Sequence, residues 1–349
     1  MGNKFISLKK KDGKDVGSKS KRHGRSQRKM AAEEELLHRQ ALSMALHQHQ
    51  LSQRFEGSMS RRIGSTSARF GSTRKMVSDP LSNGKQVPEF VEHLKTKKIV
   101  LVHGAGFGAW CWYKNIALLE EVGLLPIALD LMGSGIDQTD PNSVKTLADY
   151  AKPLIDYLHN LPEEEQVILV GHSCGGASIS YALECYPKKI SKAIFLCGTM
   201  VADGQRPFNV FAEKLGSVES FMQESQLLTY GDGKDKPPTS LMLAKQQTKG
   251  FYFNQSPDKD IALATVSMRP IPLGPIMEKL SLSPDNYGSS RRFYIQTLED
   301  HALSPDVQEK LVRDNPPEGV FKIKGSDHCP FLSKPQSLHK ILLDIAQIP

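Results

Sequence analysis

The fold of this chain is decided by the stretch Val167-Ile168-Leu169-Val170-Gly171-His172-Ser173-Cys174-Gly175. Its first four residues are apolar, which is typical of a strand buried in a parallel sheet. A Gly-x-Ser-x-Gly turn follows, and the next residues, from Ala177 to Cys185, have the composition of a helix. A serine on a sharp turn between strand and helix projects its hydroxyl clear of the sheet. We therefore expect Ser173 to be a nucleophile.

Short apolar runs and helical patterns alternate on both sides of this turn. The runs predict strands at 99–102, 125–129, 167–170, 193–197, 292–296 and 320–323. The helical patterns fall at 112–122, 146–161, 177–185 and 335–345. Strands that alternate with helices form βαβ units, so the sequence predicts an α/β fold with a mostly parallel sheet flanked by helices.

The alternation stops after Gly198 and resumes at Arg292. Residues from about 203 to 290 are rich in Pro, Met and short helical pieces. A stretch of this length is too long for a plain loop, so it predicts an inserted helical cap. We therefore divide the chain into an extension over 1–95 and a folded domain over 96–349 that carries the cap.

The extension holds most of the positive charge. Residues 1–80 contain 18 Lys and Arg against 7 Asp and Glu, whereas the rest of the chain contains 27 against 31. Few apolar residues are present to offset the entropy of ordering, which predicts disorder. A Ser- and Arg-rich N-terminus is typical of a transit peptide, which indicates the chloroplast. The alternatives are contact with an anionic membrane and a solvated tail on a cytoplasmic protein.

Several other classes of protein fit the sequence poorly. The five cysteines are scattered and odd in number, so they suggest neither a disulfide framework nor a structural zinc site. No apolar run approaches the roughly 20 residues that cross a bilayer. The mildly acidic folded part argues against binding of nucleic acid. We expect no metal and no cofactor.

A second motif supports the nucleophile. His103-Gly104-Ala105-Gly106 follows the strand at 99–102 directly and is similar to the loop that stabilises an oxyanion in serine hydrolases. One backbone N–H is expected from Ala105 and the other from Cys174, the residue after the nucleophile. Two such donors would stabilise a tetrahedral intermediate.

The acid and the base are expected further along the chain. In hydrolases that carry a Gly-x-Ser-x-Gly turn between a strand and a helix, the catalytic residues follow one another along the chain in the order serine, acid, histidine. Asp300 follows the strand at 292–296, and His328 follows the strand at 320–323, so both fall at the carboxyl edge of the sheet. The alternative acids are Asp203, Glu299 and Asp306, of which Asp203 is the strongest rival. Because one base is needed, we interpret the nearby histidines as structural, namely His103, His172 and His301.

From about Lys97 to the C-terminus, the sequence resembles the plant methylesterase and hydroxynitrile lyase family of α/β hydrolases. The motifs that carry the resemblance lie at 102–105, 108–110, 112–113, 128–131, 134–135, 167–173, 297–300 and 324–328. The resemblance implies the α/β-hydrolase fold with a Ser-His-Asp triad of Ser173, His328 and Asp300. It also implies a small-molecule substrate, the methyl ester of a plant acid such as indole-acetate, jasmonate or salicylate. The basic extension resembles that of the plastid-targeted methylesterases.

The two branches of this family differ at two positions. The lyases resemble one another in a Thr after the first motif histidine and a Lys after the catalytic histidine. Here these positions hold Gly104 and Cys329. Since a lyase needs that cation to stabilise cyanide, the sequence indicates an esterase. A lyase-like enzyme and a weakly catalytic ligand-binding sensor remain alternatives. The apolar wall of the cap is expected from residues such as Phe221, Met222 and Tyr230.

Overall fold

The computed structural model describes residues 88–211 and 226–349. The predictions of disorder and of a transit peptide concern residues that lie almost entirely outside these ranges. The described part begins with the short helix α2 (Glu89–Glu92), which precedes the predicted domain boundary at residue 95. Its Val91 is fully buried. The hydrophobic core therefore includes a side chain from the end of the predicted extension.

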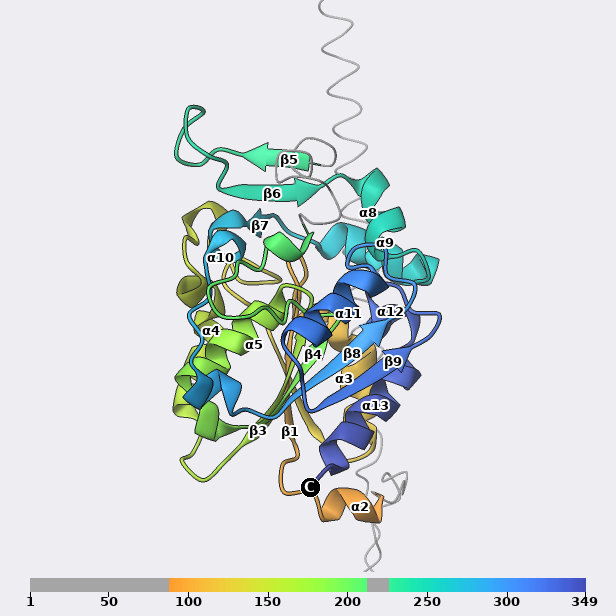
Figure 1. The fold of residues 1–349 in the computed structure, drawn as a ribbon. Coiled ribbons are helices and arrows are strands. Elements are labelled where there is room, and N and C mark those ends of the chain that lie inside the picture. Colours follow the sequence, from red (N-terminus) through yellow and green to blue (C-terminus); the bar gives the residue numbers. More distant parts are fainter. Residues whose placement is uncertain (1–87, 212–225) are drawn as a thin grey trace, which may run out of the picture. The chain divides into compact units, whose positions relative to one another are not determined.

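A six-stranded sheet forms the centre of the domain (Figure 1). Its order is β2-β1-β3-β4-β8-β9, and every neighbouring pair is parallel. This confirms the predicted α/β architecture. The strands are β1 (Lys98–Val102), β2 (Leu125–Leu129), β3 (Val167–His172), β4 (Ile190–Leu196), β8 (Arg292–Thr297) and β9 (Gly319–Ile323).

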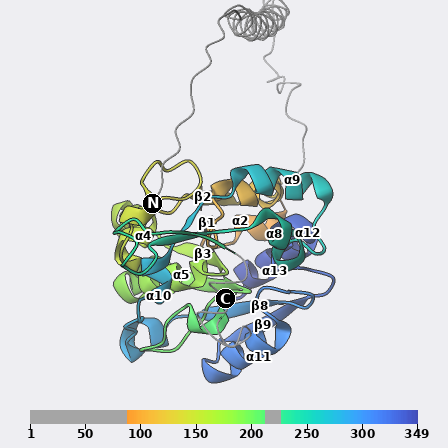
Figure 2. The ribbon, with the colours of Figure 1, turned by 90° about the horizontal axis from the view of Figure 1, so that it is seen from above.

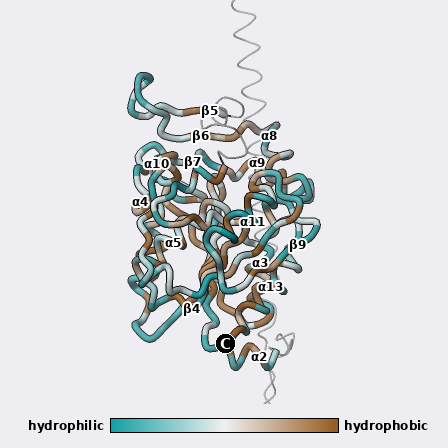
Figure 3. Tube along the Cα trace, in the orientation of Figure 1, coloured by the Kyte–Doolittle hydropathy of each residue, from teal (hydrophilic) through white to brown (hydrophobic). Residues whose placement is uncertain are grey.

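Helices cover both faces of this sheet (Figures 1 and 2). One face carries α4 (Leu147–Asn160) and α5 (Gly175–Cys185), and the other carries α3 (Tyr113–Glu121) and α13 (Pro335–Gln347). All six residues of β3 are buried, because this central strand is covered on both sides. The strands accordingly run as apolar segments through the middle of the domain (Figure 3). The other helical elements outside the cap helices are η1 (Ala109–Trp112), η2 (Pro141–Ser143), η3 (Pro187–Lys189), η4 (Pro284–Gly288), α11 (Pro305–Asp314) and α12 (Pro330–Ser333).

The insertion between β4 and β8 forms a cap that lies beyond the carboxyl ends of the parallel strands (Figure 1). Its helices are α8 (Lys245–Tyr252), α9 (Asp258–Ser267) and α10 (Leu273–Met277). The cap also contains an antiparallel sheet that the sequence did not predict, in the order β5-β6-β7. Its strands are too short to show an alternating pattern: β5 (Gln226–Thr229), β6 (Ser240–Leu243) and β7 (Ile271–Pro272).

Two buried carboxylates attach the cap to the sheet domain. Asp260 of α9 accepts hydrogen bonds from the Tyr113 hydroxyl, at 2.6 Å, and from the Lys114 ammonium. Asp327, in the loop after β9, accepts hydrogen bonds from the Gln255 backbone N–H at 2.9 Å and the Ser256 hydroxyl at 2.7 Å. Since an unpaired buried charge is costly, both carboxylates favour the attached cap.

No helix in the described ranges is both long and apolar enough to cross a membrane.

The contact between α5 and β1 leaves no room for a side chain at Gly175. A Cβ atom there would lie 2.5 Å from the His103 carbonyl oxygen. We expect Gly175→Ala to push α5 and β1 apart and to lower the free energy of unfolding by about 1–3 kcal/mol, as overpacking does. The measurement is thermal unfolding followed by circular dichroism.

Gly250→Ala is the matched control, because a Cβ at this helical position would meet nothing within 4 Å. Alanine is the better helix former, so this variant should keep or raise the melting temperature. Equal melting temperatures for the two variants would contradict the packing argument.

Candidate active site

Ser173 lies on the turn between β3 and α5 with φ at 52°, in the left-handed region that residues other than glycine rarely adopt. Hydrogen bonds hold this strained turn in place. The Ser173 N–H donates to the Leu196 carbonyl at 3.2 Å, and the Ser173 carbonyl accepts from the N–H groups of Gly176 at 2.9 Å and Thr199 at 3.0 Å. The turn thus joins the ends of β3 and β4 to the start of α5 and fixes the direction of the hydroxyl.

The ring of His328 lies between the serine and an acid. Its Nε2 is 2.9 Å from the Ser173 hydroxyl oxygen, and its Nδ1 is 2.8 Å from Oδ2 of Asp300. The side chains of His328 and Asp300 are fully shielded from solvent. With a proton on Nδ1 donated to Asp300, Nε2 can accept the serine proton. This is the arrangement of a nucleophile, its base and the acid that orients the base.

Asp300 is saturated with hydrogen bonds. Its Oδ1 accepts from the backbone N–H groups of Ala302 at 2.8 Å and Leu303 at 2.7 Å. Its Oδ2 accepts from the Thr297 hydroxyl at 2.9 Å and from the Gln308 amide at 3.3 Å, in addition to His328. These donors stabilise the ionised carboxylate in a place that water does not reach.

The rival acids lie elsewhere. Asp203 accepts a hydrogen bond from the Leu282 N–H at 2.8 Å, Asp306 lies in the first turn of α11, and neither they nor Glu299 form a hydrogen bond with His328. The adjacent His301 approaches the Gly250 carbonyl at 3.0 Å instead of the serine. The structure thus brings together Ser173, His328 and Asp300 and leaves the alternatives outside.

His172, in the nucleophile motif, is hydrogen-bonded to the backbone of His328. Its Nε2 donates to the His328 carbonyl oxygen at 2.8 Å, and its ring packs against Phe331 at 4.8 Å between centroids. Burial lowers the pKa of His172 well below its usual value, and the neighbouring His328 lowers this pKa further. A neutral, hydrogen-bonded ring suits a structural role.

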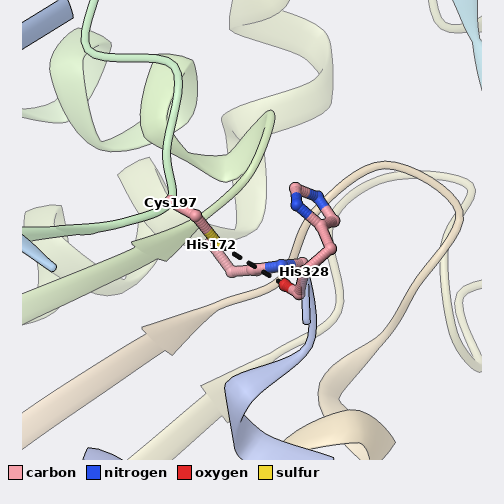
Figure 4. A group of neighbouring side chains, drawn as sticks. All are labelled: His172, Cys197 and His328. Carbon is pink, nitrogen blue, oxygen red and sulfur yellow. Dashed lines mark hydrogen bonds between the residues drawn. The ribbon is translucent and has the colours of Figure 1, made fainter. Parts of the chain in front are cut away.

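Cys197 completes a compact group with the two histidines, in which the ligand atoms lie within 4.8 Å of one another (Figure 4). Its thiol donates to the same His328 carbonyl at 3.4 Å. Burial raises the pKa of Cys197 well above its usual value, so the thiol stays protonated. Metals bind thiolates, and both ring nitrogens of His328 already have partners. This donor set therefore does not fit a metal site.

The two expected oxyanion donors lie next to the serine. Burial raises the pKa of the Cys174 thiol to about 12, while the Ser173 hydroxyl and the backbone N–H groups of Ala105 and Cys174 counteract that rise. Both N–H groups therefore lie close to the Cys174 thiol, in the residue next to Ser173. In the described part of the chain, neither N–H donates to another backbone carbonyl.

Glycine and histidine shape the loop that carries Ala105. A Cβ at Gly104 would lie 2.8 Å from the Ser173 Cβ, so only glycine allows this close approach. The His103 Nε2 accepts from the Leu131 N–H at 3.1 Å, which leaves Nδ1 to donate to the Gly104 carbonyl at 2.8 Å. His103 thus has a structural role, because it fixes the backbone next to the nucleophile.

An aromatic cluster around the base was not found by sequence reasoning. Phe107 contacts the rings of His172, Tyr252, Phe253 and Phe331, at 5.5–6.1 Å between centroids. These residues come from four distant segments, so no local pattern reveals them. The predicted wall residue Tyr230 is 42% exposed and does not belong to this cluster. Phe221 and Met222 lie outside the described residues.

Comparison with known proteins identifies the family of this chain. The chain matches the alpha/beta hydrolase family over residues 99–340. It is 71% identical to an Arabidopsis thaliana protein named "Putative methylesterase 14, chloroplastic", and the match covers both chains completely. The chain belongs to the methylesterase family of α/β hydrolases. The predicted family and the predicted esterase class are thereby confirmed.

Solved structures of esterases agree as well. The methylesterase MES16 from Arabidopsis is 35% identical, with a TM-score of 0.65 over 72% of this chain and 99% of that chain. Polyneuridine aldehyde esterase is 36% identical, with a TM-score of 0.66 over 72% of this chain and all of that chain. The names of the full-length relatives also confirm the predicted chloroplast location of this methylesterase.

The hydrogen bonds of Asp300 predict how the esterase responds when its charge is removed. We expect Asp300→Asn to lower kcat roughly 10⁴-fold, because an amide cannot hold the imidazole in the required tautomer or stabilise its cation. The measurement is steady-state hydrolysis of an aryl ester.

Asp203→Asn is the control, since its remaining oxygen can still accept from the Leu282 N–H. This variant should keep its activity. Loss of activity in Asp203→Asn, with retention in Asp300→Asn, would identify the rival acid instead.

Proposed function

We propose that this esterase hydrolyses methyl esters of small plant acids, with Ser173 as nucleophile, His328 as base and Asp300 as the acid that orients the base. The observation that carries the proposal is the continuous line of hydrogen bonds from Ser173 through His328 to Asp300. The oxyanion donors are the backbone N–H groups of Ala105 and Cys174.

Acylation begins when the Ser173 oxygen attacks the ester carbonyl carbon and His328 Nε2 takes the serine proton. The carbonyl oxygen becomes an oxyanion and accepts hydrogen bonds from the Ala105 and Cys174 N–H groups. Asp300 stabilises the imidazolium, which then gives its proton to the leaving methoxy oxygen. Methanol departs and an acyl-enzyme remains.

Deacylation repeats these steps with water. His328 removes a proton from a water molecule, which attacks the acyl carbon to form a second tetrahedral intermediate. The imidazolium returns its proton to the Ser173 oxygen as the bond to the acid breaks. The products are the free acid and methanol, and the chain ends in its starting protonation state.

The surroundings of the triad support an apolar acyl group. The ring of Tyr252 stacks on His328, and the rings of Phe107 and Phe253 pack behind it and are almost completely buried. Aromatic walls favour ring-containing or aliphatic acids, such as indole-acetate, jasmonate or salicylate. Relatives are named pFDCC methylesterase MES16 and polyneuridine aldehyde esterase, so different substrates are named within this group of similar proteins. Given the chloroplast location, a pigment-derived methyl ester belongs in the substrate panel as well.

The alternative of a hydroxynitrile lyase is disfavoured by the residue after the base. Cys329 is fully buried, and burial raises the pKa of its thiol well above the usual value. A neutral thiol supplies no positive charge for cyanide. We expect mandelonitrile to release no more cyanide with the full-length chain than with its Ser173→Ala variant. Faster release, measured by a colorimetric cyanide assay, would favour the lyase.

We expect the full-length chain to hydrolyse at least one of methyl indole-acetate, methyl jasmonate and methyl salicylate. Ser173→Ala should abolish this hydrolysis. Its loss should exceed the roughly 10²–10³-fold that removal of one oxyanion donor causes. Ser178→Ala is the control, because this buried hydroxyl in α5 has no hydrogen-bond partner among the described residues and lies outside the triad. The hydrolytic activity of both variants is measured as the rate of methanol release.

The same assay tests the sensor alternative. Rapid mixing with a chromogenic ester would show a burst of acylation followed by almost no turnover if the chain binds ligands without efficient catalysis. Continuous turnover that Ser173→Ala eliminates supports the esterase. Unchanged turnover in Ser173→Ala would identify a different nucleophile.

A further inference from the structure

Tyr252 connects the cap to the catalytic base. It is the last residue of α8, and its side chain is 7% exposed. Its ring stacks on the ring of His328, with 5.2 Å between centroids and 21° between planes. The same ring contacts Phe107 at 5.8 Å. One face of the imidazole is therefore covered by a residue of the cap.

The hydroxyl of Tyr252 differs from those of the other buried tyrosines. In the described ranges, four tyrosines are buried, and Tyr252 is the one among them whose hydroxyl forms no hydrogen bond with a described residue. Its oxygen is not among the fully enclosed side-chain atoms that lack a partner, so it keeps some access to solvent. A hydroxyl of this kind can donate to water or to a bound ligand. The other three hydroxyls are paired with Ser134 for Tyr150, with Arg292 and Asn315 for Tyr287, and with the Gly198 carbonyl for Tyr294.

The chemistry of the surroundings makes this hydroxyl a donor. Burial raises the pKa of Tyr252, and the neighbouring Cys174, Cys329 and Asp300 raise it further, so the phenol keeps its proton. Cys174 is also the residue whose N–H we assign to the oxyanion site. The ring that carries this hydroxyl is stacked on His328, whose Nε2 is 2.9 Å from the Ser173 hydroxyl oxygen, so it lies beside the place where the ester is expected.

We propose that Tyr252 is a further substrate-contacting residue, whose hydroxyl donates a hydrogen bond to an oxygen of the bound ester. This inference rests on the proposed function, because it places the ester at Ser173. The substrate then supplies the partner that the folded chain leaves out. Because the ring that carries this donor is stacked on His328, the cap contributes to the site both a binding group and a cover for the base.

Tyr252→Phe tests the inference, since it removes the hydroxyl and keeps the stacked ring. We expect kcat/KM for the preferred methyl ester to fall about 5- to 10-fold, the usual consequence of losing one hydrogen bond. The melting temperature should not fall, because no bond within the protein is lost. A lower melting temperature together with lower activity would overturn the proposal, since it would indicate a structural hydroxyl.

Tyr287→Phe is the matched control. Its hydroxyl accepts a hydrogen bond from Arg292 at 3.2 Å and from Asn315 at 2.8 Å, outside the active site. This variant should lower the melting temperature and leave kcat/KM unchanged.

Ser173→Ala separates the two proposals. If it is inactive while Tyr252→Phe matches the parent in kcat/KM, the inference about Tyr252 is wrong and the proposed esterase mechanism stands. If Ser173→Ala keeps full activity, the mechanism itself is wrong, and the role of Tyr252 is overturned with it.

Discussion

The buried charge of Asp300 is the constraint on which the site depends. A carboxylate that is 2% exposed must be met by donors, and this one receives two backbone N–H groups, a hydroxyl, an amide and the ring of His328. These donors fix the path of the chain between β8 and α11. They also fix which nitrogen of His328 faces Ser173. The same hydrogen bonds therefore stabilise the conformation of this loop and orient the ring of His328.

The parallel sheet makes this convergence possible, because it gathers the ends of β3, β8 and β9 at one edge. Packing around Phe107 then joins the oxyanion loop, the nucleophile motif, the cap and the segment after His328. Ser173 keeps its strained φ of 52° because the surrounding strands and helix hold both sides of its peptide. Each catalytic group thus depends on a neighbour from a different segment.

Much of this could be predicted from the sequence, since the signals are local. Apolar runs marked the six parallel strands, and the turn around Ser173 identified the nucleophile candidate. Chain order pointed to His328, but order alone left Asp203 beside Asp300, because only hydrogen bonds distinguish two acids that each follow a strand. The cap sheet β5-β6-β7 was missed because its strands are very short. Tyr252 and Phe107 were missed because their roles arise from contacts between distant segments.

Asp327 attaches the cap to the loop that carries His328. Lifting the segment Gln255–Ser256 would strip two hydrogen bonds from a buried carboxylate one residue before His328. The cap segment and the loop that positions the imidazole are therefore mechanically coupled, and a substitution at Ser256 would be felt at the residue next to His328.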